Sequence, residues 1–159
     1  VLAASPNNVA DVKSRMTIQT IGHDKLNMLR HVRYFKDLAG IEEHMKLHAA
    51  ILRPRFDAVL EALDTHLLDR GIASWHRPRG GYFVSVNLAE GCAQRTVELL
   101  RQAGVSMTPA GATYPYGIDP HDSNIRIAPS YPSVEELKTA MELFCICAEL
   151  AYLERLEKQ

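Results

Sequence analysis

The segment Asn124–Ser130 constrains the fold most, because it reads as a short strand with one charged residue at its centre. Ile125 and Ile127 bracket Arg126, and Pro129 follows two residues later. Successive side chains of a strand point to opposite faces, so we expect the isoleucines on a buried face and Arg126 on the other. Pro129 cannot donate a ladder hydrogen bond, and we expect it to end the strand.

A long loop rich in turn-forming residues precedes this strand, from Thr108 to Ser123. Loops of this length in compact domains are often functional, and exposed aromatic residues such as Tyr114 and Tyr116 could line a pocket there. An arginine on a rigid strand beside such a loop can hold a carboxylate through its two-pronged guanidinium. A structural ion pair with a nearby acid is the commoner use of such an arginine. Residue chemistry therefore leaves both roles open for Arg126.

Composition excludes some classes of partner. The chain has 159 residues, 47% hydrophobic and 23% charged, which suits one soluble domain or a modest domain with extra helices. A net charge of −1 gives no basic excess for a nucleic-acid partner, and no apolar run is long enough for a membrane span. Three cysteines without framework spacing favour a reducing, cytoplasmic compartment.

Helical periodicity and capping residues predict five helices. Ser133 and Glu136 form a capping box that should open the last of them. Pro54 lies inside the third and should kink it, or end its first segment near Arg53. The expected ranges are about 5–19, 24–35, 41 to about 68, 92–103 and 133–156.

Alternating apolar residues predict a small sheet. Its strands are expected at 73–77, 82–87, 105–108 and 124–127, with a hairpin at Pro78–Gly81. Val1–Ala4 reads as a further buried strand with nothing before it, as if the chain were cut from a longer one. Helices first, then strands mixed with helices, predict an α/β fold, in detail an α+β-like small domain. We expect a mixed small sheet flanked by helices and preceded by linking helices.

For three groups of residues, a purely structural role explains the pattern better than a functional one. Gly80–Phe83 is best explained by glycines that form a turn and aromatics that pack in the core, ahead of direct substrate contact. His44 and His48 share a helix face and could chelate a metal, but no third ligand is evident and a solvated face is favoured. Cys145 and Cys147 are expected to be buried core thiols rather than a redox or zinc pair.

Three motifs in order resemble the C-terminal part of pyridoxal-phosphate (PLP) dependent aminotransferases of fold type I, the aspartate aminotransferase superfamily. They are Gly80–Phe83, Gly104–Gly111 and Asn124–Ala128, and the resemblance is nearest to a bacterial aspartate/alanine-type branch. It covers Val1 to about Leu153. The resemblance implies amino-acid and 2-oxo-acid substrates, a homodimer, and an arginine, here Arg126, that grips the substrate's α-carboxylate. We take Tyr114 as a second substrate-binding candidate from its place in the loop.

The resemblance also implies a division into domains and the absence of the Schiff-base lysine from this chain. It implies that residues 1–39 end the large domain and form linking helices, and that residues 40–159 form the C-terminal small domain. The family's Schiff-base lysine should lie shortly before the segment that resembles Val1–Ala4, so no lysine here takes its place. The expected fragment therefore has no catalytic and no cofactor-binding residue and is inactive alone. The six lysines are Lys13, Lys25, Lys36, Lys46, Lys138 and Lys158.

Two other interpretations stay open. The chain could be a non-catalytic aminotransferase-like module that binds an effector or dimerises within a regulator, or a stable α+β domain with no independent function. A DNA-binding domain ahead of it in the full gene would favour the regulator. A Schiff-base lysine upstream would favour the enzyme.

Overall fold

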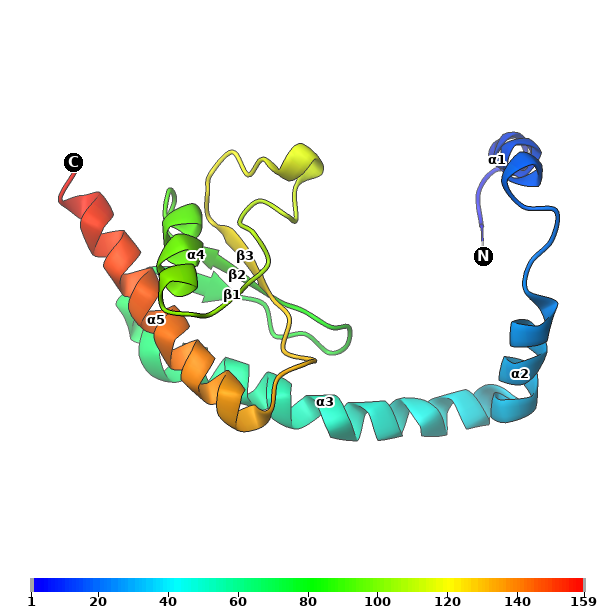
Figure 1. Ribbon diagram of the computed structural model, residues 1–159, viewed down its shortest axis with the longest axis horizontal. Coiled ribbons are helices and arrows are strands. Elements are labelled where there is room, and N and C mark those ends of the chain that lie inside the picture. Colours follow the sequence, from blue (N-terminus) through cyan, green and yellow to red (C-terminus); the bar gives the residue numbers. More distant parts are fainter. Residues whose placement is uncertain (1, 159) are drawn as a thin grey trace. The chain divides into compact units, whose positions relative to one another are not determined.

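The computed structural model describes residues 2–158. The chain divides into two compact units between Leu47 and His48, and helix α3 (Leu38–Leu67) begins in the first and ends in the second (Figure 1). The domain boundary expected between residues 39 and 40 stays a prediction. Most of the chain is helical, and helices precede a small three-stranded sheet, which confirms the expected fold class.

The first unit is built from helices with well-capped starts. Helix α1 (Pro6–Gln19) begins with a proline after Ser5, whose hydroxyl accepts a hydrogen bond from the Asn8 amide. Helix α2 (Lys25–Phe35) is capped by the Asp24 carboxylate. These starts confirm the predicted helices. No residue of α1 or α2 is buried within this unit.

The predicted strand at the N-terminal end is wrong over the residues that can be judged. Residues 2–4 are exposed and form no strand, while Val1 lies outside the described residues. A strand requires a neighbour to complete its backbone hydrogen bonds, and an apolar run by itself does not provide one. The apolar residues of this segment indicated a buried strand, but they could not show whether a neighbouring strand lies beside it.

The second unit contains the sheet. Its strands are β1 (Ala73–Trp75), β2 (Val84–Leu88) and β3 (Asn124–Ile127), in the order β1-β2-β3. Both pairs are antiparallel, so the prediction of a mixed sheet is wrong. The predicted union of β2 and β3 in one sheet is confirmed. The third predicted strand, Val105–Thr108, does not form, although Val105 and Met107 pack on the core.

One apolar core joins the sheet to three helices. Val86 of β2 and Ile125 of β3 lie in it with Leu63 of α3, Leu100 of helix α4 (Ala93–Gln102) and Phe144 of helix α5 (Val134–Leu156). All five side chains are almost completely buried. The helices therefore cover the apolar face of the sheet and leave its other face to the loops.

Local signals placed the boundaries of α5, and they placed those of α3 to within a few residues. Ser133 and Glu136 form the predicted capping box, with reciprocal hydrogen bonds of 2.9 and 3.2 Å. Helix α3 continues through Pro54 and does not end near Arg53. Beside the proline, Arg55 donates from Nη1 to the Ile51 carbonyl at 2.7 Å and from Nε to the Pro132 carbonyl at 2.8 Å. These bonds tie the segment after β3 to α3.

Two further findings concern the cysteine thiols and the length of the apolar helices. Cys145 and Cys147 are free and buried, which confirms them as core thiols. Burial raises the pKa of the Cys145 thiol to about 12. Across residues 2–158, no helix is long and apolar enough to cross a membrane.

Candidate functional site

The pairing of β2 with β3 sorts their side chains onto two faces. Val84 opposes Ile127 on the core face, whereas Ser85 opposes Arg126 on the other face. Directly opposed residues of an antiparallel pair lie on the same side of the sheet. Asn87 and Asn124 form the next opposed polar pair. The face that the helices do not cover is therefore a polar surface with Arg126 in it.

Asn124 is the centre of a hydrogen-bond network on this polar face. Its Nδ2 donates to Asn87 Oδ1 at 2.7 Å and to Ser85 Oγ at 3.0 Å, and its Oδ1 accepts from Thr113 Oγ1 at 2.7 Å. Asn124 is 8% exposed, so each of these bonds replaces solvent that the side chain has lost. The network fixes the start of β3 and ties the 108–123 loop to the sheet.

Among the residues that the structure describes, the side-chain contact found for Arg126 is with an aromatic ring. Its guanidinium carbon lies 4.3 Å from the centre of the Phe83 ring. Its Nε is buried and has no hydrogen-bond partner among the residues that the structure describes. The ion pairs found among residues 2–158 do not include Arg126. A half-buried guanidinium with an unpaired donor is able to take an anionic ligand such as a carboxylate.

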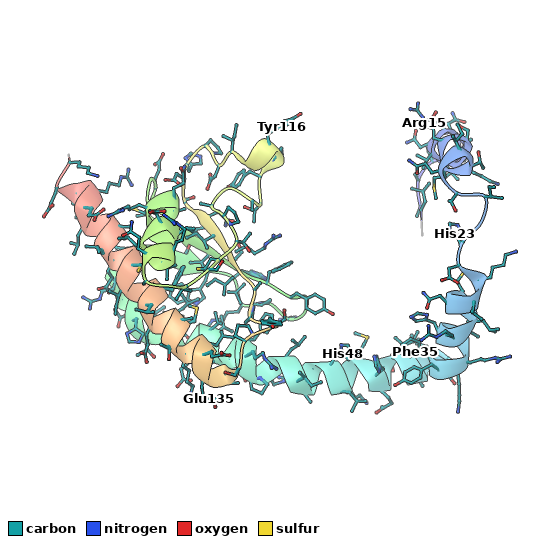
Figure 2. All side chains as sticks on the ribbon, viewed as in Figure 1. Arg15, His23, Phe35, His48, Tyr116 and Glu135 are labelled. Carbon is teal, nitrogen blue, oxygen red and sulfur yellow. The ribbon has the colours of Figure 1, made fainter. Side chains whose placement is uncertain are left out.

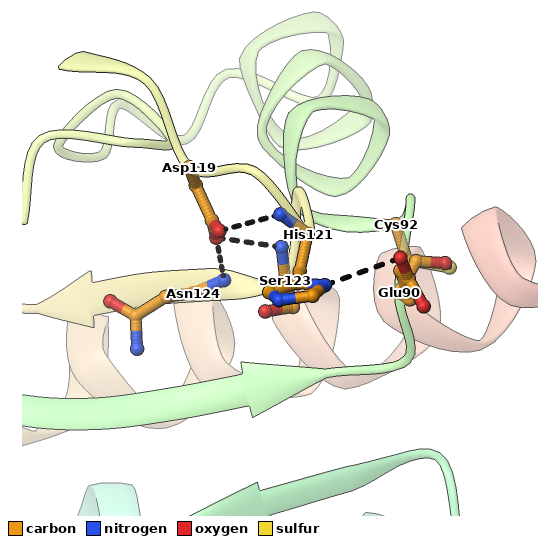
Figure 3. Close-up of polar contacts among 6 residues, drawn as sticks. All are labelled: Glu90, Cys92, Asp119, His121, Ser123 and Asn124. Carbon is orange, nitrogen blue, oxygen red and sulfur yellow. Dashed lines mark hydrogen bonds and ion pairs between the residues drawn. The ribbon is translucent and has the colours of Figure 1, made fainter. Parts of the chain in front are cut away.

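A single carboxylate organises the loop just before β3. Asp119 accepts hydrogen bonds from the backbone N–H groups of His121, Ser123 and Asn124, at 2.8 to 2.9 Å, as Figure 3 shows. These donors, the Asn124 amide first among them, hold the pKa of Asp119 below its ordinary value, against a smaller opposing effect of desolvation. The loop is therefore closed onto the strand two residues before Arg126.

The two tyrosines of this loop differ. Tyr114 is half-buried and follows Thr113, which reaches the polar face. Tyr116 is fully exposed, with a positive φ of 59°, and it projects from the tip of the loop (Figure 2). The expectation that these two aromatics could line a pocket stays a prediction. The proposed substrate contact of Tyr114 stays a prediction.

For Gly80–Phe83, the predicted turn forms, whereas the predicted core packing of the two aromatics is wrong. Gly81 has a positive φ of 88°, which confirms the turn, but Tyr82 and Phe83 are 54% and 45% exposed and do not pack in the core. Strand β2 begins only at Val84. If β2 continued in the same register, Tyr82 would lie opposite Pro129. Pro129 has no N–H to donate, so the hydrogen-bond ladder ends before this pair. Phe83 therefore lies outside the strand, and its ring contacts Arg126.

The histidine pair has a structural environment of its own. The ring of His44 lies 5.5 Å from that of Tyr34 and 5.2 Å from that of Phe35, both in edge-on arrangements. Among residues 2–158 there is no group of three or more His, Cys, Asp or Glu side chains that could hold a metal ion.

The sequence singled out Arg126 as a candidate but not the residues that support its strand. The contacts of Thr113, Asp119 and Asn124 join residues up to 39 positions apart and leave no periodic signal. The alternation in β2 did carry one usable sign, because Ser85 and Asn87 are its two polar positions. Two polar residues on the same side of a strand that faces Arg126 indicate a hydrated or ligand-binding face.

Comparison with known proteins identifies the family. The sequence profile described as aspartate amino-transferase matches residues 1–159. This chain belongs to the aspartate aminotransferase family, whose members are PLP-dependent enzymes of fold type I. It is 47% identical over 137 residues to an aspartate aminotransferase of Corynebacterium glutamicum, covering 86% of this chain and 32% of that protein. A Mycolicibacterium smegmatis protein is 43% identical over 155 residues, covering 98% and 36%.

Solved structures agree with this assignment. An aspartate transaminase of Corynebacterium glutamicum superposes with a TM-score of 0.88 at 43% identity, over 96% of this chain and 36% of that one. A kynurenine aminotransferase of Pyrococcus horikoshii, in complex with PMP, shares the fold at 21% identity, with a TM-score of 0.75 over 91% and 35%. The chain thus spans about a third of the length of these relatives.

Proposed function

We propose that this chain is the C-terminal part of a PLP-dependent aminotransferase, and that Arg126 binds the α-carboxylate of its substrates. The enzyme would move an amino group between an amino acid and a 2-oxo acid. The observation that carries the proposal is the buried Nε of Arg126, which has no acceptor among the described residues. An unpaired buried donor is unfavourable, and a carboxylate would satisfy it with a charge-assisted hydrogen bond.

One arginine can serve both halves of such a reaction. The amino acid and the 2-oxo acid both carry an α-carboxylate, so the same contact would orient each of them. Arg126 is suited to this because Ile125 and Ile127 anchor its strand in the core. A fixed backbone lets binding energy go into orienting the substrate's Cα–H bond.

Tyr114 is proposed to line the same pocket. The residue before it, Thr113, is hydrogen-bonded to Asn124, two positions from Arg126 on the same strand face. This bond holds the residue next to Tyr114 on the strand of the arginine, which supports the proposal. An aromatic ring there would exclude water from the carboxylate contact.

The residues of this chain do not fit the cofactor itself. A lysine that binds PLP covalently must react as the neutral amine, which burial or a neighbouring cation favours. All six lysines of this chain are exposed, and Lys46 pairs with Glu43. We infer that the Schiff-base lysine and the phosphate-binding groups belong to the remaining part of the enzyme. PLP, when bound there, supplies the electron sink for the reaction.

We base the remaining proposals on the family resemblance. Residues 1–39 would end the large domain and link it to the small domain of residues 40–159, and the intact enzyme would act as a homodimer. The chain by itself is expected to show no transaminase turnover and no cofactor absorbance band with PLP. A visible band that borohydride traps at one defined lysine would contradict this assignment.

The experiment is Arg126→Lys in the intact enzyme. A lysine keeps the charge but loses the planar fork, so the affinity for amino-acid and 2-oxo-acid substrates should fall together, by about tens- to thousands-fold. That range corresponds to roughly 2–5 kcal/mol for truncating one partner of a desolvated pair. PLP affinity should stay unchanged. The exposed Arg79 offers a matched control, and Arg79→Lys should leave both affinities as they are. Unchanged substrate affinity in Arg126→Lys would remove the proposed role.

A further inference from the structure

Phe83 has an arrangement that neither core packing nor turn formation requires. The ring is 45% exposed and belongs to no strand, yet the Arg126 guanidinium carbon lies 4.3 Å from its centre. A phenylalanine left half in solvent loses the usual stabilisation of burial. Its position therefore points to the contact with the arginine.

The backbone directs Phe83 to this place. Val84 points into the core and Ser85 to the opposite face. Phe83, just before the strand, lies on the side of Ser85, because its ring contacts Arg126. Ser85 is the direct partner of Arg126, which makes Phe83 the diagonal neighbour of the arginine across the pair. Gly81, with its positive φ, turns the chain into this approach.

The contact can hold a guanidinium in place without occupying its donors. The face of an aromatic ring attracts a cation through the quadrupole of its π-system. A ring against the guanidinium leaves the N–H groups around its edge free for a carboxylate. An acidic partner would neutralise the charge and compete with a carboxylate ligand, and the ion pairs found among residues 2–158 do not include Arg126.

Orientation matters because arginine is long and flexible. An arginine side chain that is free in solution must lose its rotamer freedom when a carboxylate binds. A ring that restricts the guanidinium beforehand reduces that loss. The buried Nε of Arg126 has no hydrogen-bond partner among the described residues, so a donor of this guanidinium is left for a ligand.

We propose that Phe83 is a positioning residue for substrate binding: its ring holds the Arg126 guanidinium so that its N–H edge meets the α-carboxylate. This inference rests on the proposed function of Arg126. It predicts that removing the ring weakens substrates that carry an α-carboxylate and spares those that lack it.

The test uses the intact enzyme with L-aspartate and β-alanine, which is L-aspartate without its α-carboxylate. Phe83→Leu keeps an apolar side chain but removes the π-face, and should raise KM for L-aspartate by about two- to thirtyfold with kcat nearly unchanged. The half-reaction with β-alanine should not change. Phe83→Tyr retains the π-face and should restore the L-aspartate KM. Tyr82→Leu, at the neighbouring exposed aromatic, is the control and should behave as the unmodified enzyme.

Three outcomes decide the matter separately. Equal losses for L-aspartate and β-alanine in Phe83→Leu would assign Phe83 a merely structural role and overturn the inference. Unchanged KM in Phe83→Leu, together with a raised KM in Arg126→Met, would overturn the inference and leave the function of Arg126 standing. Unchanged KM in Arg126→Met would overturn the proposed function and the inference with it.

Discussion

Thr113 donates from Oγ1 to Oδ1 of Asn124 at 2.7 Å, and this single contact fastens the middle of a long loop to the strand that presents Arg126. The two residues are 11 positions apart in the sequence. Asn124 also holds Ser85 and Asn87 of the neighbouring strand. The side chain of Asn124 therefore joins the three segments around the candidate site.

Replacing Asn124 tests this junction. Asn124→Ala would leave Thr113, Ser85 and Asn87 without their partner in a half-buried setting, at a cost of about 1–3 kcal/mol. Hydrogen–deuterium exchange in the intact protein should therefore be faster by about 5- to 150-fold over residues 108–124. Asn7→Ala, on exposed helix α1, is the control and should change nothing in this loop. Unaltered exchange in Asn124→Ala would show that the loop is held by other contacts.

The strand of Arg126 could be predicted because its information is local. Ile125 and Ile127 alternate with Arg126, and Pro129 marks the end, so pattern and propensity agree. The capping box of α5 is likewise contained in four consecutive residues. Elements whose signals are this short were placed to within a residue or two.

Pairing was the part that local patterns could not supply. Val105 and Met107 alternate and pack on the core as a strand would, but no neighbouring strand completes their hydrogen bonds among the described residues. Phe83 has a strong strand propensity, yet the ladder stops before it because Pro129 lies in the partner segment. The alternation tells which face is buried and does not tell which segment lies beside it.

Asp119 offers a second test of how the loop supports β3. Its carboxylate accepts three backbone N–H groups, and an asparagine keeps the size but has one weaker acceptor oxygen and no charge. Asp119→Asn should weaken substrate binding and speed exchange at Ser123 and Asn124, without altering PLP affinity. The exposed Asp69→Asn is a suitable control. Equal effects of the two variants would argue against a specific role of the Asp119 cluster.

The same cluster predicts a dependence on pH. The folded-state pKa of Asp119 lies below its ordinary value, so its contribution to stability is complete above the unfolded pKa of about 3.9. The contribution is lost as the pH falls through the lower folded pKa. The free-energy difference between the native protein and Asp119→Asn should therefore shrink on acidification. A difference that stays constant from pH 6 to pH 2 would exclude this linkage.

Glu98 provides a titration with a defined midpoint. Hydrogen bonds from Arg101, first, and from Gln102 lower the pKa of the Glu98 carboxyl to about 2. Because the folded pKa is depressed, this interaction is complete above the unfolded pKa and is lost as the pH falls through about 2. NMR titration of the carboxyl should give that midpoint, and Arg101→Met should move it toward an ordinary value of about 4.3. A midpoint that does not move in Arg101→Met would rule out Arg101 as the principal cause.

Two glycines separate backbone strain from steric exclusion in the loop. Gly104 and Gly111 both have a positive φ, of 87° and 83°, so alanine at either position costs about 1–2 kcal/mol of conformational strain. At Gly104 a Cβ would meet nothing within 4 Å, whereas at Gly111 it would lie 2.3 Å from the Gly117 carbonyl oxygen. Gly111→Ala must therefore displace backbone in addition to adopting a strained conformation.

The two substitutions should have different effects on function. Gly104→Ala should lower stability by about the strain energy and leave substrate affinity intact. Gly111→Ala should also push the 111–117 turn outward, which moves Thr113 and Tyr114 away from the polar face and raises KM for amino-acid substrates. Urea unfolding and steady-state kinetics on the intact enzyme measure the two quantities separately. Equal KM values in the two variants would mean that the position of this turn does not matter for binding, and the proposed contact of Tyr114 would be lost with it.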